Sequence, residues 1–287
     1  MQVLVTGSRG RIGSVIVEQL KAAGHHTVEF DKVLGNDMLD GAAVRAAAQG
    51  CDAIIHTASL LGRKTDDPDE TMAVGLQGTW HVLMAAQEAG CQRVISFSSV
   101  NALGIFMGQH APDYFPIDDD HPPRPRSVYG MMKRLGEQMC EYFTFNTGIT
   151  TICLRPPGVT LPEYYAQARS RRAADPESEW RQNWEYGAVC HVQDVAAAAV
   201  LGLTCPDPGH VTLLLCADDI ASDTPSRAMA AKVHPDVPWR SNPADEAAYA
   251  ADPFKALVDN SKAKRVLGWQ PQYTWRELSR AAGATEA

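Results

Sequence analysis

Apolar and polar positions follow two alternating periods along the first half of the chain. Short apolar runs bounded by turn residues are typical of buried strands, and they occur at residues 2–7, 26–31, 52–59, 93–99 and 150–156. Apolar residues at helical spacing separate these runs, over residues 12–24, 40–50, 71–90 and 129–148. Parallel strands require crossovers of this length, so the pattern predicts an α/β fold with a doubly wound parallel sheet.

The pattern becomes less regular after residue 156. A stretch that carries arginines and tryptophans extends without clear periodicity from Gly158 to about Tyr186. It is followed by a predicted helix, a strand and a second helix, over residues 191–203, 210–217 and 261–269. Another irregular segment, rich in proline and aspartate, spans about Leu103 to Arg126. We therefore expect a regular N-terminal domain followed by a smaller lobe.

Composition excludes some classes of protein. The 287 residues are 45% hydrophobic, which is enough for a substantial core. A net charge of −8 argues against nucleic acid or an anionic membrane as the main partner. The 7 cysteines show no C-x-x-C spacing and several lie in apolar runs, so we expect reduced, buried thiols. No apolar stretch of about 18 residues and no export signal is evident, so we expect a cytoplasmic protein.

The segment TGSRGRIG places three glycines where the first predicted strand becomes a helix. In this position Gly7 permits a tight turn, Gly10 lets the backbone approach a diphosphate, and Gly13 lets the helix pack closely on the sheet. The helix N-terminus then presents backbone N–H groups to the anion. The strand–turn–helix context therefore predicts a dinucleotide-binding site.

Asp31 ends the second predicted strand, about 20 residues after the turn. An acidic residue there accepts hydrogen bonds from the adenosine ribose and repels a 2′-phosphate, so NAD is favoured over NADP. Arg9, Arg11 and Lys32 lie nearby and leave NADP open, although we interpret them as solvated surface residues.

Tyr129 and Lys133 lie four residues apart in YGMMK, so they share one face of the predicted helix. A lysine ammonium near a phenol stabilises the phenolate, which suits the tyrosine to proton transfer near neutral pH. Ser98 and Ser99 follow the fourth predicted strand, at the sheet edge where ligands bind in this fold. The alternative is that each of these residues is purely structural.

Taken in order, TGSRGRIG, Asp31, DAIIHTAS, FSSVNALG and YGMMK resemble the short-chain dehydrogenase/reductase superfamily, in particular its extended, epimerase/dehydratase-like branch. The resemblance covers residues 1 to about 160 and continues weakly through HVQDVA. It implies a dinucleotide-binding Rossmann domain over residues 1–158. Residues 159–287 would be mostly a small substrate lobe, with about 187–217 returning to the sheet. In character the chain is nearest to uronate and other sugar dehydrogenases.

The resemblance also implies roles for particular residues. Tyr129 would be the general acid/base, Lys133 would bind the nicotinamide ribose and tune Tyr129, and Ser99 rather than Ser98 would hydrogen-bond the substrate oxygen. The implied substrate contacts are Ser99, Asn101, Tyr129 and Pro157. The implied cofactor contacts are Gly7, Ser8, Arg9, Gly10, Arg11, Ile12, Gly13, Asp31, Asp37, Met38, His56, Thr57, Ala58, Tyr129, Lys133 and Pro156.

The chain departs from the family pattern at two places. Gly75 stands where the family usually has an asparagine that supports a proton relay, which puts that relay in doubt. After the fifth predicted strand comes Arg155-Pro156-Pro157, without the asparagine usual in sugar-nucleotide enzymes. The two prolines stiffen the backbone and remove two N–H donors. This departure counts against a bound sugar nucleotide.

The arginines and tryptophans between residues 158 and 186 have two interpretations each. Arg169, Arg171 and Arg172 could bind a carboxylate or phosphate, but a solvated helix face is the commoner arrangement for such a run. Trp180 and Trp184 suit a lid or a sugar-stacking wall, and core packing explains them equally well.

Three functions are consistent with these features. We favour an NAD-dependent dehydrogenase that acts on a secondary hydroxyl of a small polyol, free sugar or sugar acid. The alternatives are a sugar-nucleotide 4-epimerase that retains its NAD, and a non-catalytic NAD(P)-binding regulator. The complete set of Ser99, Tyr129 and Lys133 argues against the regulator. The resemblance implies a homodimer, and the histidines lack metal-ligand spacing, so we expect no metal site.

Overall fold

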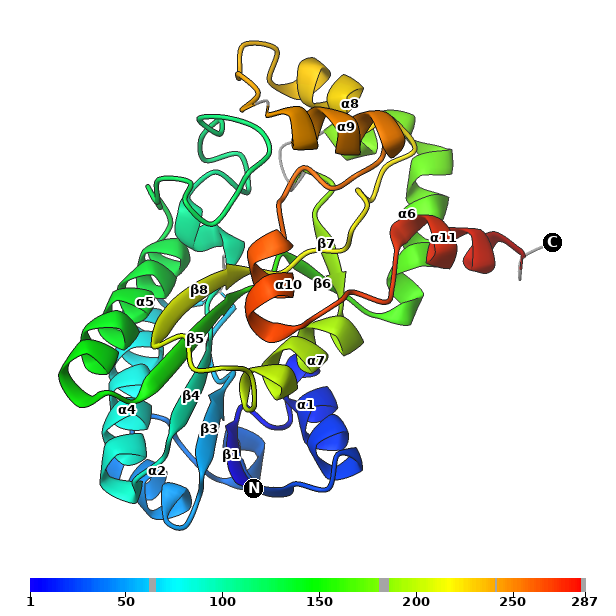
Figure 1. The fold of residues 1–287 in the computed structure, drawn as a ribbon. Helices are drawn as coiled ribbons and strands as arrows, with labels where there is room; N and C mark the ends of the chain where they lie inside the picture. Colours follow the sequence, from blue (N-terminus) through cyan, green and yellow to red (C-terminus); the bar gives the residue numbers. More distant parts are fainter. Residues whose placement is uncertain (62–65, 181–185, 241, 285–287) are drawn as a thin grey trace.

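The computed structural model describes residues 1–61, 66–180, 186–240 and 242–284. At its centre six parallel strands form a sheet in the order β2-β1-β3-β4-β5-β8 (Figure 1). The strands are β1 (Gln2–Thr6), β2 (His26–Phe30), β3 (Ala53–His56), β4 (Arg93–Phe97), β5 (Thr150–Arg155) and β8 (His210–Leu214). The strand order reverses at β1 and β3, so the predicted doubly wound α/β sheet is confirmed.

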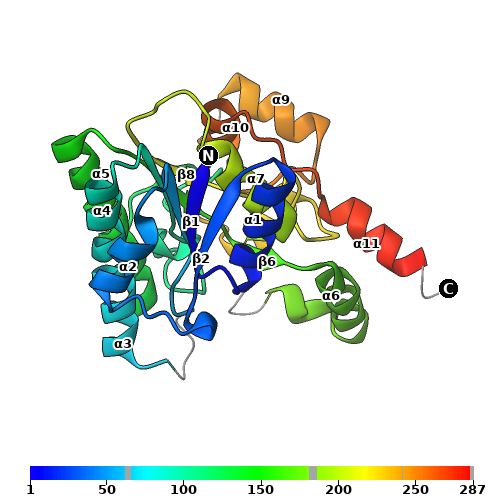
Figure 2. The same cartoon turned by 90° about the horizontal axis from the view of Figure 1, so that it is seen from below.

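Helices cover both faces of this sheet (Figure 2). One layer consists of α2 (Gly41–Ala48), α4 (Gly78–Ala89) and α5 (Val128–Thr147). The other consists of α1 (Arg11–Ala22), α7 (Val192–Gly202) and α10 (Ser261–Leu267). Each layer packs an apolar stripe against the strands, so the sheet is buried on both faces, as parallel sheets require.

The helix predicted at residues 71–90 is divided into three parts. These are α3 (Pro68–Met72), a π-turn at Ala73–Gln77, and α4. Asp67 caps the start by accepting the Glu70 backbone N–H. Within the π-turn, the Thr79 hydroxyl donates to the Gly75 carbonyl at 2.5 Å. A side chain thus satisfies a carbonyl in the widened turn, and such π-turns are frequent at functional sites.

The stretch after residue 157 is more regular than its sequence predicts, so the prediction of irregular structure is wrong here. β6 (Gly158–Thr160) pairs in parallel with β7 (Val189–His191) in a small second sheet. The helix α6 (Pro162–Ala174) follows β6, with proline at its first position, where proline favours a helix start. Only Tyr165 and Ala168 of α6 are buried. Its apolar periodicity is therefore too weak to reveal the helix.

Three further helices complete the C-terminal region: α8 (Ser226–Val233), α9 (Pro243–Ala251) and α11 (Trp275–Ala284). The helices α8 and α9 lie close to each other at the top of Figure 1, away from the parallel sheet. The sequence pattern predicts none of these three helices, because α8 and α9 are short and bury few side chains.

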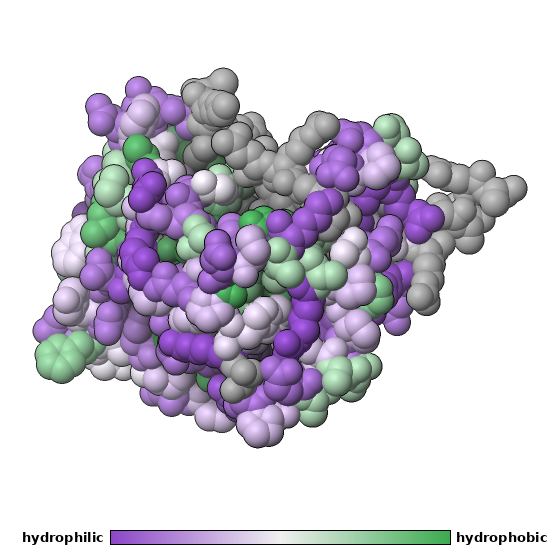
Figure 3. Space-filling model, turned by 90° about the horizontal axis from the view of Figure 1, so that it is seen from above, coloured by the Kyte–Doolittle hydropathy of each residue, from purple (hydrophilic) through white to green (hydrophobic). Residues whose placement is uncertain are grey.

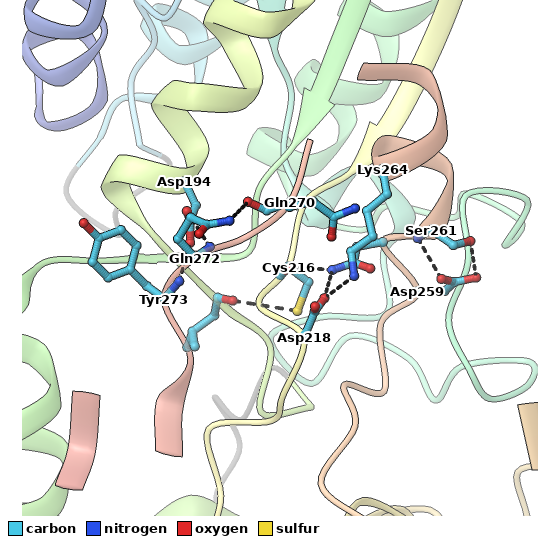
Figure 4. A network of polar contacts seen from close by, with 11 residues as sticks. Asp194, Cys216, Asp218, Asp259, Ser261, Lys264, Gln270, Gln272 and Tyr273 are labelled. Carbon is cyan, nitrogen blue, oxygen red and sulfur yellow. Dashed lines mark hydrogen bonds and ion pairs between the residues drawn. The ribbon is translucent and has the colours of Figure 1, made fainter. Parts of the chain in front are cut away.

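Buried carboxylates fasten the C-terminal segment to the rest of the molecule. Asp194, in the first turn of α7, accepts the backbone N–H groups of Gln272 and Tyr273 at 2.9 and 3.1 Å (Figure 4). Asp219 accepts those of Trp275 and Arg276 at 2.8 and 3.0 Å. These carboxylates satisfy backbone groups that would otherwise lack partners, so Asp194 has a structural role.

The surface is mostly polar and the cysteines are buried, as the composition and the sequence positions of the cysteines predict. Hydrophilic residues dominate the face shown in Figure 3, and apolar residues are scattered among them. All 7 cysteines are buried and unpaired, as predicted. In the described parts of the chain, no helix combines the length and apolar character needed to cross a membrane.

Candidate active site

A cavity of about 620 Å³ opens at the carboxyl ends of the central strands. The glycine turn after β1 and the start of α1 form part of its wall, together with the segments that follow β2, β3, β4 and β5 and the start of α5. This is the edge at which ligands bind in doubly wound sheets. The volume lies in the range typical of small-molecule and cofactor sites.

The glycine turn has the close geometry of a phosphate-binding loop. Gly7 has a φ of +67°, and a Cβ there would lie 2.6 Å from Thr57 Oγ1 and 2.7 Å from the Ala58 nitrogen. A Cβ on Gly13 would overlap the Gly7 carbonyl. Both positions therefore require glycine, and the resulting turn leaves the N–H groups at the start of α1 open to an anion.

Asp31 lies immediately after β2, beside this turn. Its carboxylate accepts the backbone N–H groups of Arg9 and Val33, each at 2.9 Å. The guanidinium of Arg9 is directed to Glu29, 3.0 Å away. This corner of the cavity therefore presents a carboxylate, and Arg9 is directed to Glu29, which Lys21 also contacts at 3.0 Å.

Most of the predicted site residues meet in this cavity. The predicted cofactor contacts in its wall are Gly7, Gly10, Arg11, Ile12, Gly13, Asp31, Asp37, Met38, Thr57, Ala58, Tyr129, Lys133 and Pro156. The predicted substrate contacts in its wall are Ser99, Asn101, Tyr129 and Pro157. Three predicted cofactor contacts, Ser8, Arg9 and His56, lie outside it.

His56 is committed to a buried chain of hydrogen bonds. Its Nδ1 lies 2.7 Å from Thr6 Oγ1, and its Nε2 lies 3.3 Å from Thr79 Oγ1. Because the Thr79 hydroxyl donates to the Gly75 carbonyl, it must accept from the imidazole, which places the ring proton on Nε2. Burial, reinforced by the charge of Lys133, lowers the pKa of His56 to about 3. His56 is thus a neutral group that links β1, β3 and α4.

Tyr129 and Lys133 lie one turn apart at the start of α5, which Ser127 caps through the Gly130 backbone N–H. Lys133 Nζ lies 5.6 Å from the centroid of the Tyr129 ring and donates to the Phe97 carbonyl at 2.7 Å. That bond fixes the ammonium at the carboxyl end of β4. Burial disfavours the charged form and lowers the pKa of Lys133 to about 8.

The two serines after β4 have different partners. The Ser98 hydroxyl donates to Glu137 Oε1 at 2.5 Å, so it is used inside the protein. Ser99 Oγ accepts the backbone N–H and the side-chain N–H of Asn101, at 3.2 and 3.3 Å. With its acceptor positions occupied, the Ser99 hydroxyl keeps its proton for an oxygen in the cavity.

Glu137 also forms a buried ion pair with Arg155 at the end of β5. The two contacts measure 2.7 and 2.8 Å, and the Arg155 and Glu137 side chains are only 3% and 1% exposed. Burial opposes the charge on Glu137, but hydrogen bonds from Arg155 and Ser98 outweigh it and lower the pKa of Glu137. Arg155 is thereby committed to the interior rather than to a ligand.

Gly75, where the sequence departs from the family pattern, packs against Met132. A Cβ at Gly75 would overlap the Met132 side chain. Both residues border a void of about 10 Å³ that also touches Lys133. The thioether therefore fills the space that an asparagine at position 75 would need, and the two residues are matched in size.

The arginine run of α6 lies away from the cavity wall. Arg169 and Arg171 are exposed. Arg172 stacks on the Trp275 ring, with 4.3 Å from its guanidinium carbon to the ring centroid, and it donates to the Ala221 carbonyl. The geometry of Arg172 therefore shows a structural role.

The predictions for the two tryptophans of this stretch concern side chains that the structure does not describe. Trp184 lies outside the described residues, and the side chain of Trp180 is not described either. Among the described residues, no group of three or more His, Cys, Asp or Glu side chains could hold a metal ion.

Residues 3–213 match the model of the NAD dependent epimerase/dehydratase family. The chain belongs to that family. The resemblance carried by the glycine turn, the serine pair and the Tyr/Lys pair is therefore confirmed, since the match includes all three motifs.

Individual relatives of the family are similar over different parts of the chain. The uronate dehydrogenase of Pseudomonas putida is 32% identical over 171 residues, which cover 54% of this chain and 59% of that enzyme. A short-chain dehydrogenase/reductase superfamily protein from Agrobacterium tumefaciens has a TM-score of 0.72 at 21% identity, covering 100% of this chain and 97% of that one. The UDP-glucose 4-epimerase of Thermotoga maritima has a TM-score of 0.69 at 18% identity, covering 100% and 99%. These two structures show the shared fold.

Some lining residues are not among the predicted contacts, although Ser59, Phe97, Ser98 and Val100 lie within the motifs DAIIHTAS and FSSVNALG. The lining residues outside the predicted set are Phe30, Lys32, Asn36, Ser59, Leu60, Leu61, Glu70, Val74, Phe97, Ser98, Val100, Gly158 and Val159. Most follow the carboxyl end of a strand, so the ligand-edge rule for this fold could have found them. Glu70 and Val74 come from α3 and the π-turn, and no local sequence signal marks them.

We predict that Glu137→Gln strongly destabilises the fold. Removing one charge leaves Arg155 buried without its partner, which costs about 3–5 kcal/mol. Urea denaturation at neutral pH measures the loss, and Glu141→Gln, an exposed change one turn along α5, is the control. The pKa of Glu137 is lowered in the folded protein, so its contribution is present above roughly pH 4.3 and falls as the pH drops. Equal stability of the two variants at neutral pH would contradict this account.

Proposed function

We propose that this protein is an NAD-dependent oxidoreductase. It transfers a hydride between a secondary alcohol of a small sugar, sugar acid or polyol and the nicotinamide. The observation that carries the proposal is that Ser99, Tyr129 and Lys133 line the same cavity as the glycine turn and Asp31. A proton-transfer group, a hydroxyl donor and a dinucleotide cradle therefore border one space.

The residues of this cavity have separable roles in the proposed reaction. Tyr129 takes the hydroxyl proton of the alcohol, or returns it in the reverse direction. Lys133, held by the Phe97 carbonyl, supplies positive charge close to the Tyr129 ring and stabilises its phenolate. Ser99 donates to the substrate oxygen and orients the reacting carbon. Its donor direction follows from its two bonds with Asn101.

The described cavity suits NAD. The glycine turn would hold the diphosphate, Asp31 the adenosine ribose, and Lys133 the nicotinamide ribose. When bound, NAD supplies the hydride acceptor. The family is named for NAD dependence, and the similar structure from Agrobacterium tumefaciens contains bound NAD. Arg9 contacts Glu29, so binding of a 2′-phosphate by Arg9 would have to compete with that contact.

The proposed substrate class has two supports. The P. putida relative is a uronate dehydrogenase, although the matched segment spans only 59% of its length. Two of the three Arg155 side-chain nitrogens donate to Glu137 and the Arg155 side chain is only 3% exposed, so Arg155 is poorly placed to hold a sugar nucleotide. In this arrangement residues 1–158 bind the dinucleotide, and residues 159–287 form mostly the substrate lobe, with α7 and β8 packed on the main sheet.

We predict that Tyr129→Phe reduces turnover at least a thousandfold while binding of NAD is retained, because only the proton-transfer hydroxyl is lost. The assay is NADH formation with NAD and a panel of free sugars, uronates, polyols and sugar nucleotides. Tyr273→Phe, a tyrosine outside the cavity wall and outside α5, is the control. A Tyr129→Phe enzyme with wild-type turnover would refute the assigned role.

The same assay separates the competing functions. Net NADH from a free sugar, sugar acid or polyol supports the dehydrogenase. Tightly retained NAD, with sugar-nucleotide isomers appearing and no net NADH, identifies a 4-epimerase instead. Binding of NAD without turnover on any substrate, by the wild type and by Tyr129→Phe alike, favours a regulator.

We predict that Asp31→Asn weakens the preference for NAD. The substitution keeps one oxygen to accept a backbone N–H but removes the charge that repels a 2′-phosphate. We expect the ratio of kcat/KM for NAD to that for NADP to fall about tenfold, with Asp236→Asn as an exposed control. An unchanged ratio would mean that Asp31 does not discriminate between the ribose of NAD and the 2′-phosphorylated ribose of NADP.

We further propose that two copies pair through the outer face of α5. Met131, Leu135, Tyr142 and Phe145 are all exposed on α5, and their spacing puts them on one helix face. Phe145 is 87% exposed, and Trp80 of the adjacent α4 is 49% exposed. Exposed apolar residues gathered on one helix face, here interrupted by Gln138, are typical of an interface.

We predict that Phe145→Lys converts a dimer into a monomer, because a charge in the centre of an apolar interface loses its hydration. Sedimentation should give about twice the 31.1 kDa of one chain for the wild type and a single chain for the variant. Val33→Lys replaces another exposed apolar residue outside α4 and α5 and should leave the dimer intact. A monomeric wild type would refute the proposed pairing.

A further inference from the structure

Arg11 occupies a special place in the cavity wall. It is the first residue of α1, directly after the glycine turn, and its side chain is exposed. Its Nη1 donates to the Val159 carbonyl at 3.3 Å. Val159 belongs to β6, which follows the two prolines after β5, and it lines the same cavity. The Arg11 side chain therefore reaches from the glycine turn to a segment almost 150 residues away in the sequence.

The other cations near the cavity are engaged differently. Arg9 pairs with Glu29 at 3.0 Å, and Lys32 lies 3.9 Å from Glu70. In contrast, no ion pair found between described residues involves Arg11. Its contact is with a neutral carbonyl, so among residues 1–61, 66–180, 186–240 and 242–284 no carboxylate matches its charge.

The location of Arg11 favours an anion as the missing partner. The first backbone N–H groups of a helix have no acceptors within the helix, and the helix dipole adds positive potential at the same point. A guanidinium carries five N–H donors in a planar fork, of which one contacts Val159 here. The remaining donors and the helix N-terminus can therefore bind the same doubly charged group.

We propose that Arg11 is a clamp for the cofactor diphosphate and that the Val159 carbonyl holds it in place. This inference rests on the cofactor site of the proposed function. A 2′-phosphate would lie at the adenosine ribose, beside Asp31, where Arg9 and Lys32 are found. The Arg11 side chain extends instead toward β6, so we assign it to the diphosphate. The clamp also joins the bound diphosphate to the strand that begins the C-terminal region.

The test compares a ligand that contains the diphosphate with one that lacks it. ADP-ribose is titrated by calorimetry and adenosine by NMR, into the wild type, Arg11→Gln and Arg265→Gln. Arg265 is an exposed arginine of α10, so its variant matches the loss of charge away from the cavity. We expect Arg11→Gln to weaken ADP-ribose about tenfold and to leave adenosine unchanged, with no effect of Arg265→Gln. Added salt should weaken ADP-ribose more for the wild type than for Arg11→Gln.

The outcomes distinguish this proposal from the proposed function. Equal affinity of wild type and Arg11→Gln for ADP-ribose overturns the clamp, and so does an equal loss for ADP-ribose and adenosine. A wild type that binds no ADP-ribose overturns the cofactor site and the clamp together. Selective loss of ADP-ribose affinity supports the clamp even if the panel of alcohols shows no oxidoreductase turnover, because this binding assay requires no catalysis.

Discussion

The candidate site depends on one buried ion pair, Glu137 with Arg155. It joins α5 to β5, and through the Ser98 hydroxyl it also holds the end of β4. These are the elements that carry Lys133 and Ser99. Two charges with little exposure tolerate few alternative arrangements, because Arg155 is the most buried partner of Glu137 and the half-buried Arg134 supplies a longer contact of 3.2 Å. The pair therefore fixes the spacing between the helix and the two strands that border the cavity.

The sequence predicts those features of the molecule that depend only on residues close together in the chain. The sheet, its main helices and the glycine turn follow from periodicity and from backbone positions that only glycine can occupy. The Tyr129–Lys133 pair follows from helical spacing. In contrast, α6 escapes prediction because it buries only two side chains. Its helical form depends on tertiary partners such as Trp275, which stacks on Arg172 and lies about a hundred residues further along the chain.

Side-chain partners limited the prediction of individual site residues. The cofactor contact predicted for His56 rests on its sequence position, whereas the structure shows two threonines from β1 and α4 bonded to its ring and leaves it out of the cavity wall. The choice between Ser98 and Ser99 depends on Glu137, which lies on another element. The replacement at Gly75 becomes intelligible only with Met132, which fills the same space. Such pairs are long-range, so no local window of sequence contains them.

The internal commitment of polar groups at the sheet edge has a consequence for how this protein can change. The ring nitrogens of His56, the Ser98 hydroxyl, and the Nε and Nη2 atoms of Arg155 are all bonded within the protein. Altering any of them would disturb the scaffold before it altered selectivity. New specificity is therefore most accessible through the loops and the C-terminal region, where substitutions leave this internal network intact. The fold thus separates an internally bonded layer of polar groups from surrounding loops that can be substituted without breaking it.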